Sequence, residues 1–147
     1  MSFFEIGIFN GKYSENVGTL WRTAYQLGAS GIFTVAYRYS RQPSDTVKAY
    51  RHIPLRNFET VQDFLGGVPE DAKIVCVEMG GTPLKEFKHP KQAIYLLGAE
   101  DSGIDKDLLD VSDHVISIEA VRQESFNVAV AGAIIMYHRL INQQNGD

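Results

Sequence analysis

Glycines follow two apolar runs of this sequence and mark places where a ligand can be bound. Gly80 and Gly81 come after the run 73–79, and Gly98 and Gly103 frame the turn after the run 93–97. Glycine permits tight turns, and ligands of open α/β sheets bind at the carboxyl ends of strands. We therefore expect these turns to form the rim of a binding pocket.

The chemistry of such a pocket is narrowed by patterns that do not occur. Neither glycine cluster matches the dinucleotide fingerprint GxGxxG or the phosphate-binding motif GxxxxGK[ST]. Dinucleotide hydride transfer and P-loop phosphoryl transfer therefore lose support. The histidines do not have the spacing of metal ligands, and we expect surface or partly packed side chains at all of them: His52, His89, His114 and His138.

Three short motifs contain further polar residues that could do chemistry. The motifs read NVGTLWRTA at 16–24, LLGAEDSGI at 96–104 and ESFNVAVA at 124–131. In this order they resemble the successive motifs of the SpoU (TrmH-like) branch of the SPOUT superfamily of RNA methyltransferases. The resemblance extends from about residue 5 to residue 140.

Two departures from the family pattern are visible. Phe126 stands where the family usually has leucine, a change of apolar shape that should affect packing more than chemistry. The stretch 119–123 lacks the usual proline in the approach to the third motif. This second departure bears on cofactor affinity.

The resemblance implies transfer of a methyl group from S-adenosylmethionine to a ribose 2'-hydroxyl of RNA, with tRNA favoured over rRNA. It also implies a C-terminal trefoil knot from about residue 74 onward, and a cofactor bound in a bent form, largely by backbone groups. Holding the methyl group, the attacking oxygen and the leaving sulfur in line supplies much of the rate. The expected cofactor contacts are Met79, Gly80, Gly98, Ile118, Ser125 and Asn127.

Arg22 matches the family arginine that activates the ribose hydroxyl. A guanidinium is a poor proton acceptor, so stabilising a developing alkoxide and clamping the adjacent phosphate describes its role better. By the same resemblance Asn16 orients Arg22 or the substrate, while Glu100 and Asn127 hold the pocket and the hydroxyl. Taken singly, each residue has an ordinary alternative role, such as Ser125 as the N-cap of the last helix.

The elements that must position these residues follow from periodicity. Apolar runs alternate with amphipathic stretches, which predicts one α/β domain over residues 1–147, with a mostly parallel sheet and helices on both faces. Ser14 and Asn57 are the expected N-caps, and Gly28 is an expected C-terminal glycine. The expected strands are 4–9, 32–36, 73–79, 93–97 and 115–118, and the expected helices are 15–28, 58–65, 105–109 and 125–141.

The net charge of −4 argues against a protein that coats nucleic acid through bulk charge. The segment 37–56 is nevertheless basic and carries tyrosines, so it is a candidate surface for phosphates and bases, or else a solvated loop. The expected RNA contacts are Arg22, Arg38, Arg41, Lys48 and Arg51.

The cellular compartment and the oligomeric state are predicted from the cysteine content, the lengths of the apolar runs and the last helix. Cys76, the single cysteine, lies in an apolar run and predicts core packing in a reducing cytoplasm. The apolar runs fall short of the ~20 residues of a membrane span, and no leader pattern opens the sequence. The last helix is apolar around much of its circumference, which favours a packing partner or else burial of the helix within the monomer. The resemblance implies a homodimer through the first and last helices, with the active site completed across it.

Three alternatives remain open at this point. One is a catalytically idle RNA-binding domain of the SPOUT type, and another is a flavodoxin-like or nucleotide-binding α/β protein. A nearer alternative is a SPOUT enzyme that methylates the base instead of the ribose.

Overall fold

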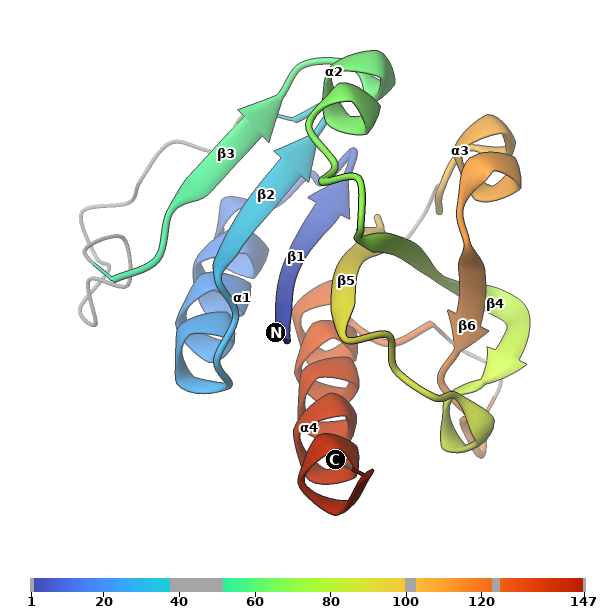
Figure 1. Cartoon of the computed structure of the whole chain (residues 1–147). Helices are drawn as coiled ribbons and strands as arrows, with labels where there is room; N and C mark the ends of the chain where they lie inside the picture. Colours follow the sequence, from blue (N-terminus) through green and yellow to red (C-terminus); the bar gives the residue numbers. More distant parts are fainter. Residues whose placement is uncertain (1, 38–51, 100–102, 123–124, 147) are drawn as a thin grey trace.

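The computed structural model describes residues 2–37, 52–99, 103–122 and 125–146, except for the side chains of 144–146, and its centre is a six-stranded sheet. The strand order is β3-β2-β1-β5-β4-β6, and all these pairings are parallel (Figure 1). The strands are β1 (Phe3–Phe9), β2 (Gly31–Val35), β3 (Leu55–Phe58), β4 (Lys73–Pro83), β5 (Gln92–Gly98) and β6 (His114–Ser117). The predicted α/β class is confirmed.

Helices cover both faces of the sheet, as the sequence predicts for a parallel sheet. One face carries α1 (Ser14–Gln26) and α4 (Val128–Gly146), which lie side by side (Figure 1). The other face carries α2 (Val61–Gly66) and α3 (Lys106–Val111). A 3-10 helix, η2 (Leu84–Glu86), follows β4.

The sheet separates two apolar cores. Ile6 and Ile8 of β1 pack with α1 and α4 in the first core, whereas Phe64 of α2 and Leu108 of α3 belong to the second. Cys76 is fully buried in the second core, as predicted, and burial raises the pKa of its thiol to about 11. A thiol with so high a pKa stays protonated and is a poor nucleophile.

The prediction of a helix over 58–65 with Asn57 as its cap is wrong at its beginning. Leu55–Phe58 is strand β3, which pairs with β2, and the Asn57 side chain accepts a hydrogen bond from the Thr34 hydroxyl. Helix α2 begins only at Val61, capped by the Thr60 hydroxyl, which accepts from the Asp63 N–H at 3.0 Å. A strand of four residues is too short to be recognised by periodicity.

The two ends of α1 differ in how well they were predicted. Gly28 has a φ of +92° after the helix, which confirms it as the C-terminal glycine. Ser14 is not the N-cap: Tyr13 holds that position in an extended conformation, and the Ser14 hydroxyl lies 3.0 Å from the Tyr37 hydroxyl.

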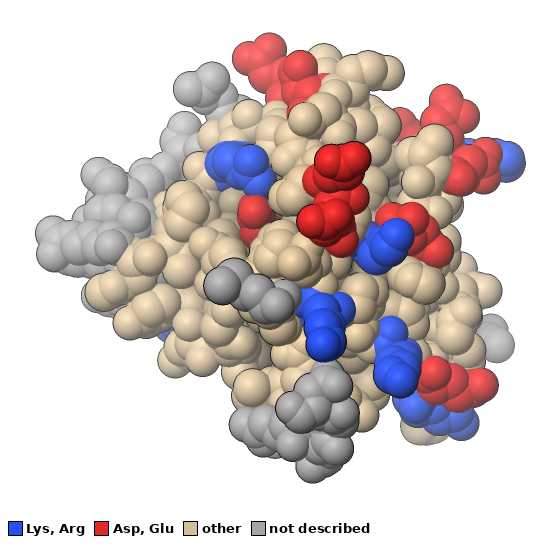
Figure 2. All heavy atoms as spheres, in the orientation of Figure 1, with Lys and Arg blue, Asp and Glu red and all other residues tan. Residues whose placement is uncertain are grey.

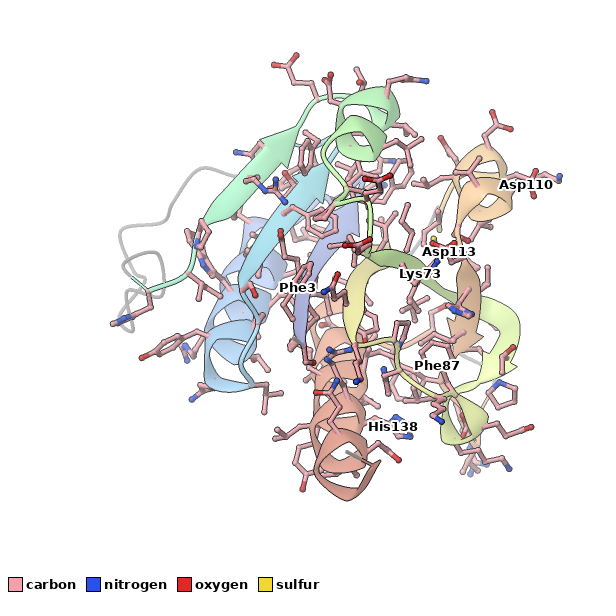
Figure 3. The ribbon with its side chains drawn as sticks, in the orientation of Figure 1. Phe3, Lys73, Phe87, Asp110, Asp113 and His138 are labelled. Atoms are coloured by element: carbon pink, nitrogen blue, oxygen red, sulfur yellow. The ribbon has the colours of Figure 1, made fainter. Side chains whose placement is uncertain are left out.

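A buried arginine ties α4 to the amino ends of β1 and β5. Arg139 is 1% exposed and donates hydrogen bonds to the carbonyls of Pro90 (2.7 Å) and Lys91 (2.8 Å) and to the hydroxyl of Tyr95 (3.0 Å). The neighbouring His138 points from α4 toward the segment that carries Phe87 (Figure 3). This cluster lies at the opposite end of the strands from their carboxyl ends.

Within the described part of the chain, the helices are too short or too polar to cross a membrane. The histidine, cysteine and carboxylate side chains described there also form no group that could hold a metal ion.

Candidate functional site

A cavity of about 440 Å³ opens at the carboxyl ends of β4, β5 and β6, beside the start of α4. Its volume falls in the range of roughly 300–1,000 Å³ that is usual for small-molecule sites. The cavity includes these predicted cofactor contacts: Met79, Gly80, Gly98, Ile118 and Ser125. The glycine-rich turns therefore meet at one pocket, as expected.

An irregularity in β4 forms one side of this cavity. The expected strand ends at Met79, but β4 continues to Pro83, and its pairing with β6 shifts register between Val77 and Thr82. Gly80 has a φ of +88°, and a Cβ on Gly81 would lie only 2.6 Å from the Val115 carbonyl oxygen. Only glycine suits both positions, and the resulting bulge presents backbone groups to the cavity.

The turn after β5 forms a second side. A Cβ on Gly98 would lie 2.7 Å from the Gly103 carbonyl carbon, so the two backbones touch. Ala99 and Gly103 form a bridge, and Gly103 has a φ of +67°. Glu100, which belongs to this turn, lies outside the described residues, so its proposed catalytic role is not located.

Two charged residues of the cavity were missed by sequence reasoning. Glu78 accepts hydrogen bonds from the Ile104 N–H at 2.9 Å and from the Met79 N–H at 3.2 Å. Arg122 lines the cavity from the stretch that follows β6. A carboxylate at the end of an apolar strand, just before two glycines, was the signal available for Glu78.

The third motif connects the cavity with α1. The Asn127 Oδ1 accepts from the N–H groups of Ala129 (2.9 Å) and Val130 (3.2 Å), so Asn127, and not Ser125, caps α4. The Asn127 Nδ2 donates to the Asn16 Oδ1 at 3.1 Å. Asn127 thus joins the first and third motifs, and it is absent from the cavity lining that includes Ser125.

Phe126, the departure from the family pattern, is half-buried against the first core and also lines the cavity. Its ring therefore forms part of the pocket wall. The change from leucine affects the shape of the site as well as packing.

Arg22 is exposed on α1 and lines neither the cavity above nor its smaller neighbour. It lies about 9 Å further along the helix axis than Asn16 and about 120° around it. The two side chains therefore leave the helix in different directions. The other predicted RNA contacts lie outside the described residues: Arg38, Arg41, Lys48 and Arg51.

The SpoU rRNA Methylase family matches residues 4–137 of this sequence. The chain belongs to this family. Its relatives include the 23S rRNA (guanosine(2553)-2'-O)-methyltransferase RlmP of Bacillus subtilis (strain 168), which is 30% identical over 131 residues, 84% of this chain and 52% of RlmP. An uncharacterized tRNA/rRNA methyltransferase of Archaeoglobus fulgidus is 27% identical over 132 residues, 84% of this chain and 58% of that protein. This chain therefore spans little more than half the length of these relatives.

Solved structures of other proteins share the fold. The SpoU methyltransferase AviRb from Streptomyces viridochromogenes, in complex with AdoMet, has a TM-score of 0.89 at 18% identity and is matched over 99% of this chain and 60% of AviRb. A structure described as giving insights into the 2-OH methylation of C/U34 on tRNA has a TM-score of 0.84 at 21% identity, over 99% of both chains. At these identities the likeness establishes the fold alone.

Proposed function

We propose that this protein transfers a methyl group from S-adenosylmethionine to a ribose 2'-hydroxyl of RNA. The observation that carries the proposal is the cavity beside β4, β5 and β6, which is lined by five of the six expected cofactor contacts: Met79, Gly80, Gly98, Ile118 and Ser125. Membership of the SpoU rRNA Methylase family and the activity named for the B. subtilis relative support the same reaction.

The cavity suits a ligand that combines rings with a charged chain. Leu97 and Val128 give it apolar walls, while Gly80 and Gly98 bring backbone groups to its surface. The Ser125 hydroxyl and the Glu78 carboxylate add polar groups. When bound there, S-adenosylmethionine supplies an electrophilic methyl group on a sulfonium.

The trefoil knot of the family belongs to the same proposal. We propose that the chain from about residue 74 onward threads through itself. Segments from β4, from the turn after β5 and from the stretch after β6 line one cavity, which is the crowding that such a knot produces. The expected knot would hold these segments together without a cofactor.

The ribose hydroxyl is proposed to lie by the Asn16–Asn127 pair. The amides hold each other at 3.1 Å, so both are oriented before the substrate arrives. Because the two amides are already oriented, no free energy is spent on ordering them during the reaction, and the barrier to methyl transfer is lower. Arg22 then stabilises the developing alkoxide and clamps the neighbouring phosphate. As the oxygen–methyl bond forms, the methyl–sulfur bond breaks to leave a neutral thioether, and the hydroxyl proton passes to solvent.

A homodimer would explain why Arg22 lines neither cavity of its own chain. Val130, Ile134, Tyr137 and Ile141 repeat every three or four residues and form one stripe along α4. Within the stripe, Val130 is 48%, Tyr137 56% and Ile141 38% exposed. We propose that a second copy covers this stripe and supplies its Arg22 to the site.

The distribution of charge directs RNA away from one face. Figure 2 shows acidic side chains gathered over α2 and α3 in the upper part of the view. Acidic residues of α2, of the stretch that follows it and of α3 include Asp63, Glu70, Asp71, Asp107 and Asp110, of which Asp110 is paired with Lys106 at 3.1 Å. A polyanion is repelled there, so the basic segment 37–56 is the proposed RNA surface. A tRNA is the proposed substrate, which suits a catalytic domain with a modest contact surface.

The first experiment is calorimetric titration with S-adenosylmethionine, followed by methylation of unmodified tRNA transcripts and of 23S rRNA with a labelled methyl donor. Digestion to nucleosides should return the label as a 2'-O-methylnucleoside from tRNA. Label on the base would favour a base methyltransferase, and label from rRNA alone would overturn the tRNA proposal. Without cofactor binding, the idle RNA-binding alternative would replace this one.

Substitution of the arginine tests its role. Arg22→Ala should lower the rate of transfer by about 100-fold or more, because a donor to a developing oxyanion is worth about 10²–10³ in rate. The dissociation constant for S-adenosylmethionine should stay near that of the wild type, since Arg22 does not line the cavity. Arg22→Lys is the matched control and should recover only part of the rate, because lysine lacks the bidentate fork. A parallel loss of cofactor affinity and rate would contradict the prediction.

A further inference from the structure

A second cavity of about 110 Å³ lies next to the first, on the α1 side. Ala99 and Val128 line both cavities, so the two spaces adjoin across these residues. The remaining lining comes from the end of β1 and the start of α1: Ile8, Gly11, Lys12, Tyr13 and Asn16. The smaller cavity therefore lies beside the larger one.

Tyr13 is an exposed aromatic residue at the rim of this smaller cavity. Its side chain is 58% exposed, and its backbone is extended at the N-cap of α1. An aromatic ring presented in this way is the group on which proteins stack the bases of single-stranded RNA. Asn16, further inside, is held by Asn127.

The tyrosine is also tied to the segment proposed to bind RNA. Ser14, the next residue, lies 3.0 Å from the Tyr37 hydroxyl through its own hydroxyl. A Cβ on Gly11 would lie 3.8 Å from the Tyr37 ring. The basic residues begin directly after Tyr37 in the sequence. Tyr37, the first residue of the proposed RNA segment, therefore lies close to Tyr13.

The size of the cavity decides which part of a nucleotide it takes. A cavity of about 150 Å³ holds one benzene ring, so 110 Å³ does not hold a whole nucleotide. A reacting oxygen must lie about 3–3.5 Å from the atom it attacks. The ribose is thereby placed at the wall formed by Ala99 and Val128, and the base extends outward to the rim.

We propose that Tyr13 stacks on the base of the target nucleotide while the ribose lies over Asn16. Tyr13 is then a substrate-binding residue that selects an unpaired nucleotide, since only an unstacked base can reach the ring. This inference rests on the methyl transfer proposed above and adds the part of the site that holds the RNA base.

The test uses the full chain with Tyr13→Ala, Tyr13→Phe and Tyr13→Leu. RNA affinity is measured without S-adenosylmethionine, by fluorescence anisotropy of the transcript that the wild type methylates, and kcat/KM for that transcript is measured separately. Tyr13→Ala and Tyr13→Leu should each lose roughly 5- to 150-fold in kcat/KM and should bind RNA more weakly. Tyr13→Phe should stay near the wild type because it keeps the ring.

Two further measurements separate the possible failures. The cofactor dissociation constant should not change in any Tyr13 variant, and Val111→Ala, at a 56% exposed position on α3, should match the wild type throughout. Equal kcat/KM values for Tyr13→Leu and Tyr13→Phe would show that an apolar side chain suffices and that ring stacking is not needed. That result, or a Tyr13→Ala variant with wild-type kcat/KM, would overturn this inference and leave the proposed function standing. Absence of RNA methylation by the wild type would overturn the proposed function and this inference with it.

Discussion

Glu78 shapes the cavity through the backbone of another segment. Its carboxylate accepts from the Ile104 N–H at 2.9 Å and lies 2.7 Å from where a Cβ of Gly103 would be. The side chain therefore holds the end of the turn 99–103 against β4. Without the Glu78 carboxylate, the Ile104 N–H would lose its hydrogen-bond acceptor, and this contact would no longer hold Ile104 next to β4.

The consequence is a prediction at the residue scale. Glu78→Ala should weaken S-adenosylmethionine binding by about tenfold or more, because a hydrogen bond to a charged group contributes about 1.5–3 kcal/mol. Glu78→Gln is the matched control: its amide oxygen can still accept from the Ile104 N–H, so the loss should be smaller. Calorimetry measures the affinity, and hydrogen exchange should show faster exchange of the Ile104 amide in the Ala variant. Unchanged exchange at Ile104 would refute the positioning role.

At the scale of elements, α1 and α4 approach each other closely over the sheet. Gly132 makes this possible, since a Cβ there would lie 2.5 Å from Leu20 Cδ1 and 3.1 Å from Leu97 Cδ1. Asn16 on α1 and Asn127 before α4 meet near the same helix contact. Close packing of the two helices therefore also sets the amide pair of the proposed site.

The substitution Gly132→Ala should have two opposing effects on the stability of the protein. Alanine favours a helix by about 1 kcal/mol over glycine, but overpacking a core costs about 1–3 kcal/mol. We expect net destabilisation of up to about 2 kcal/mol, measured by urea unfolding. Gly66→Ala at the end of α2 is the control, because a Cβ there meets no atom within 4 Å, and it should not lower stability. Equal or higher stability of Gly132→Ala would show that the helices can separate at little cost.

At the scale of the whole molecule, the chain is held together at the end opposite the cavity. His89 connects the segment after η2 with α4 and β5: its ring nitrogens lie 2.7 Å from the Tyr95 hydroxyl and 2.8 Å from the His138 Nδ1. Burial, followed by the nearby His138 and Arg139, lowers the pKa of His89 to about 3. His89 is therefore neutral in the folded protein near neutral pH.

Acid should destabilise the fold through this histidine. In the unfolded chain the pKa of a histidine is about 6.5, so between pH 6.5 and 3 the unfolded state binds a proton that the folded state does not. The free energy of unfolding should fall with falling pH in this window, by at most about 1.4 kcal/mol per pH unit and by less because His89 is only partly buried. Urea unfolding at pH 7.5, 5.5 and 4.5 measures the slope, and His89→Gln should reduce it. If the free energy of unfolding changed with pH equally in the wild type and in His89→Gln, His89 would not be the cause of the acid destabilisation.

Much of the fold was predictable because its signals are local. Alternating apolar runs gave most strands and helices to within a few residues, and glycines at the irregularity of β4 and at the end of β5 correctly marked the pocket. Strand β3 was missed because four residues at the sheet edge carry too little periodicity. The caps Ser14 and Asn57 were wrong because a polar residue near a helix start can find another partner, such as Tyr37 or Thr34.

The sequence by itself determined the family, the α/β class and several of the residues around one cavity, because motifs and turns are encoded within a few neighbouring positions. Only the tertiary structure decided which distant polar groups meet. Asn16 and Asn127 are 111 residues apart, and Glu78 reaches Ile104 across 26. Those pairings follow from the order β1-β5-β4-β6, which places β5 between β1 and β4. The order of strands in a parallel sheet depends on how the connecting helices pack, and no short stretch of sequence records it.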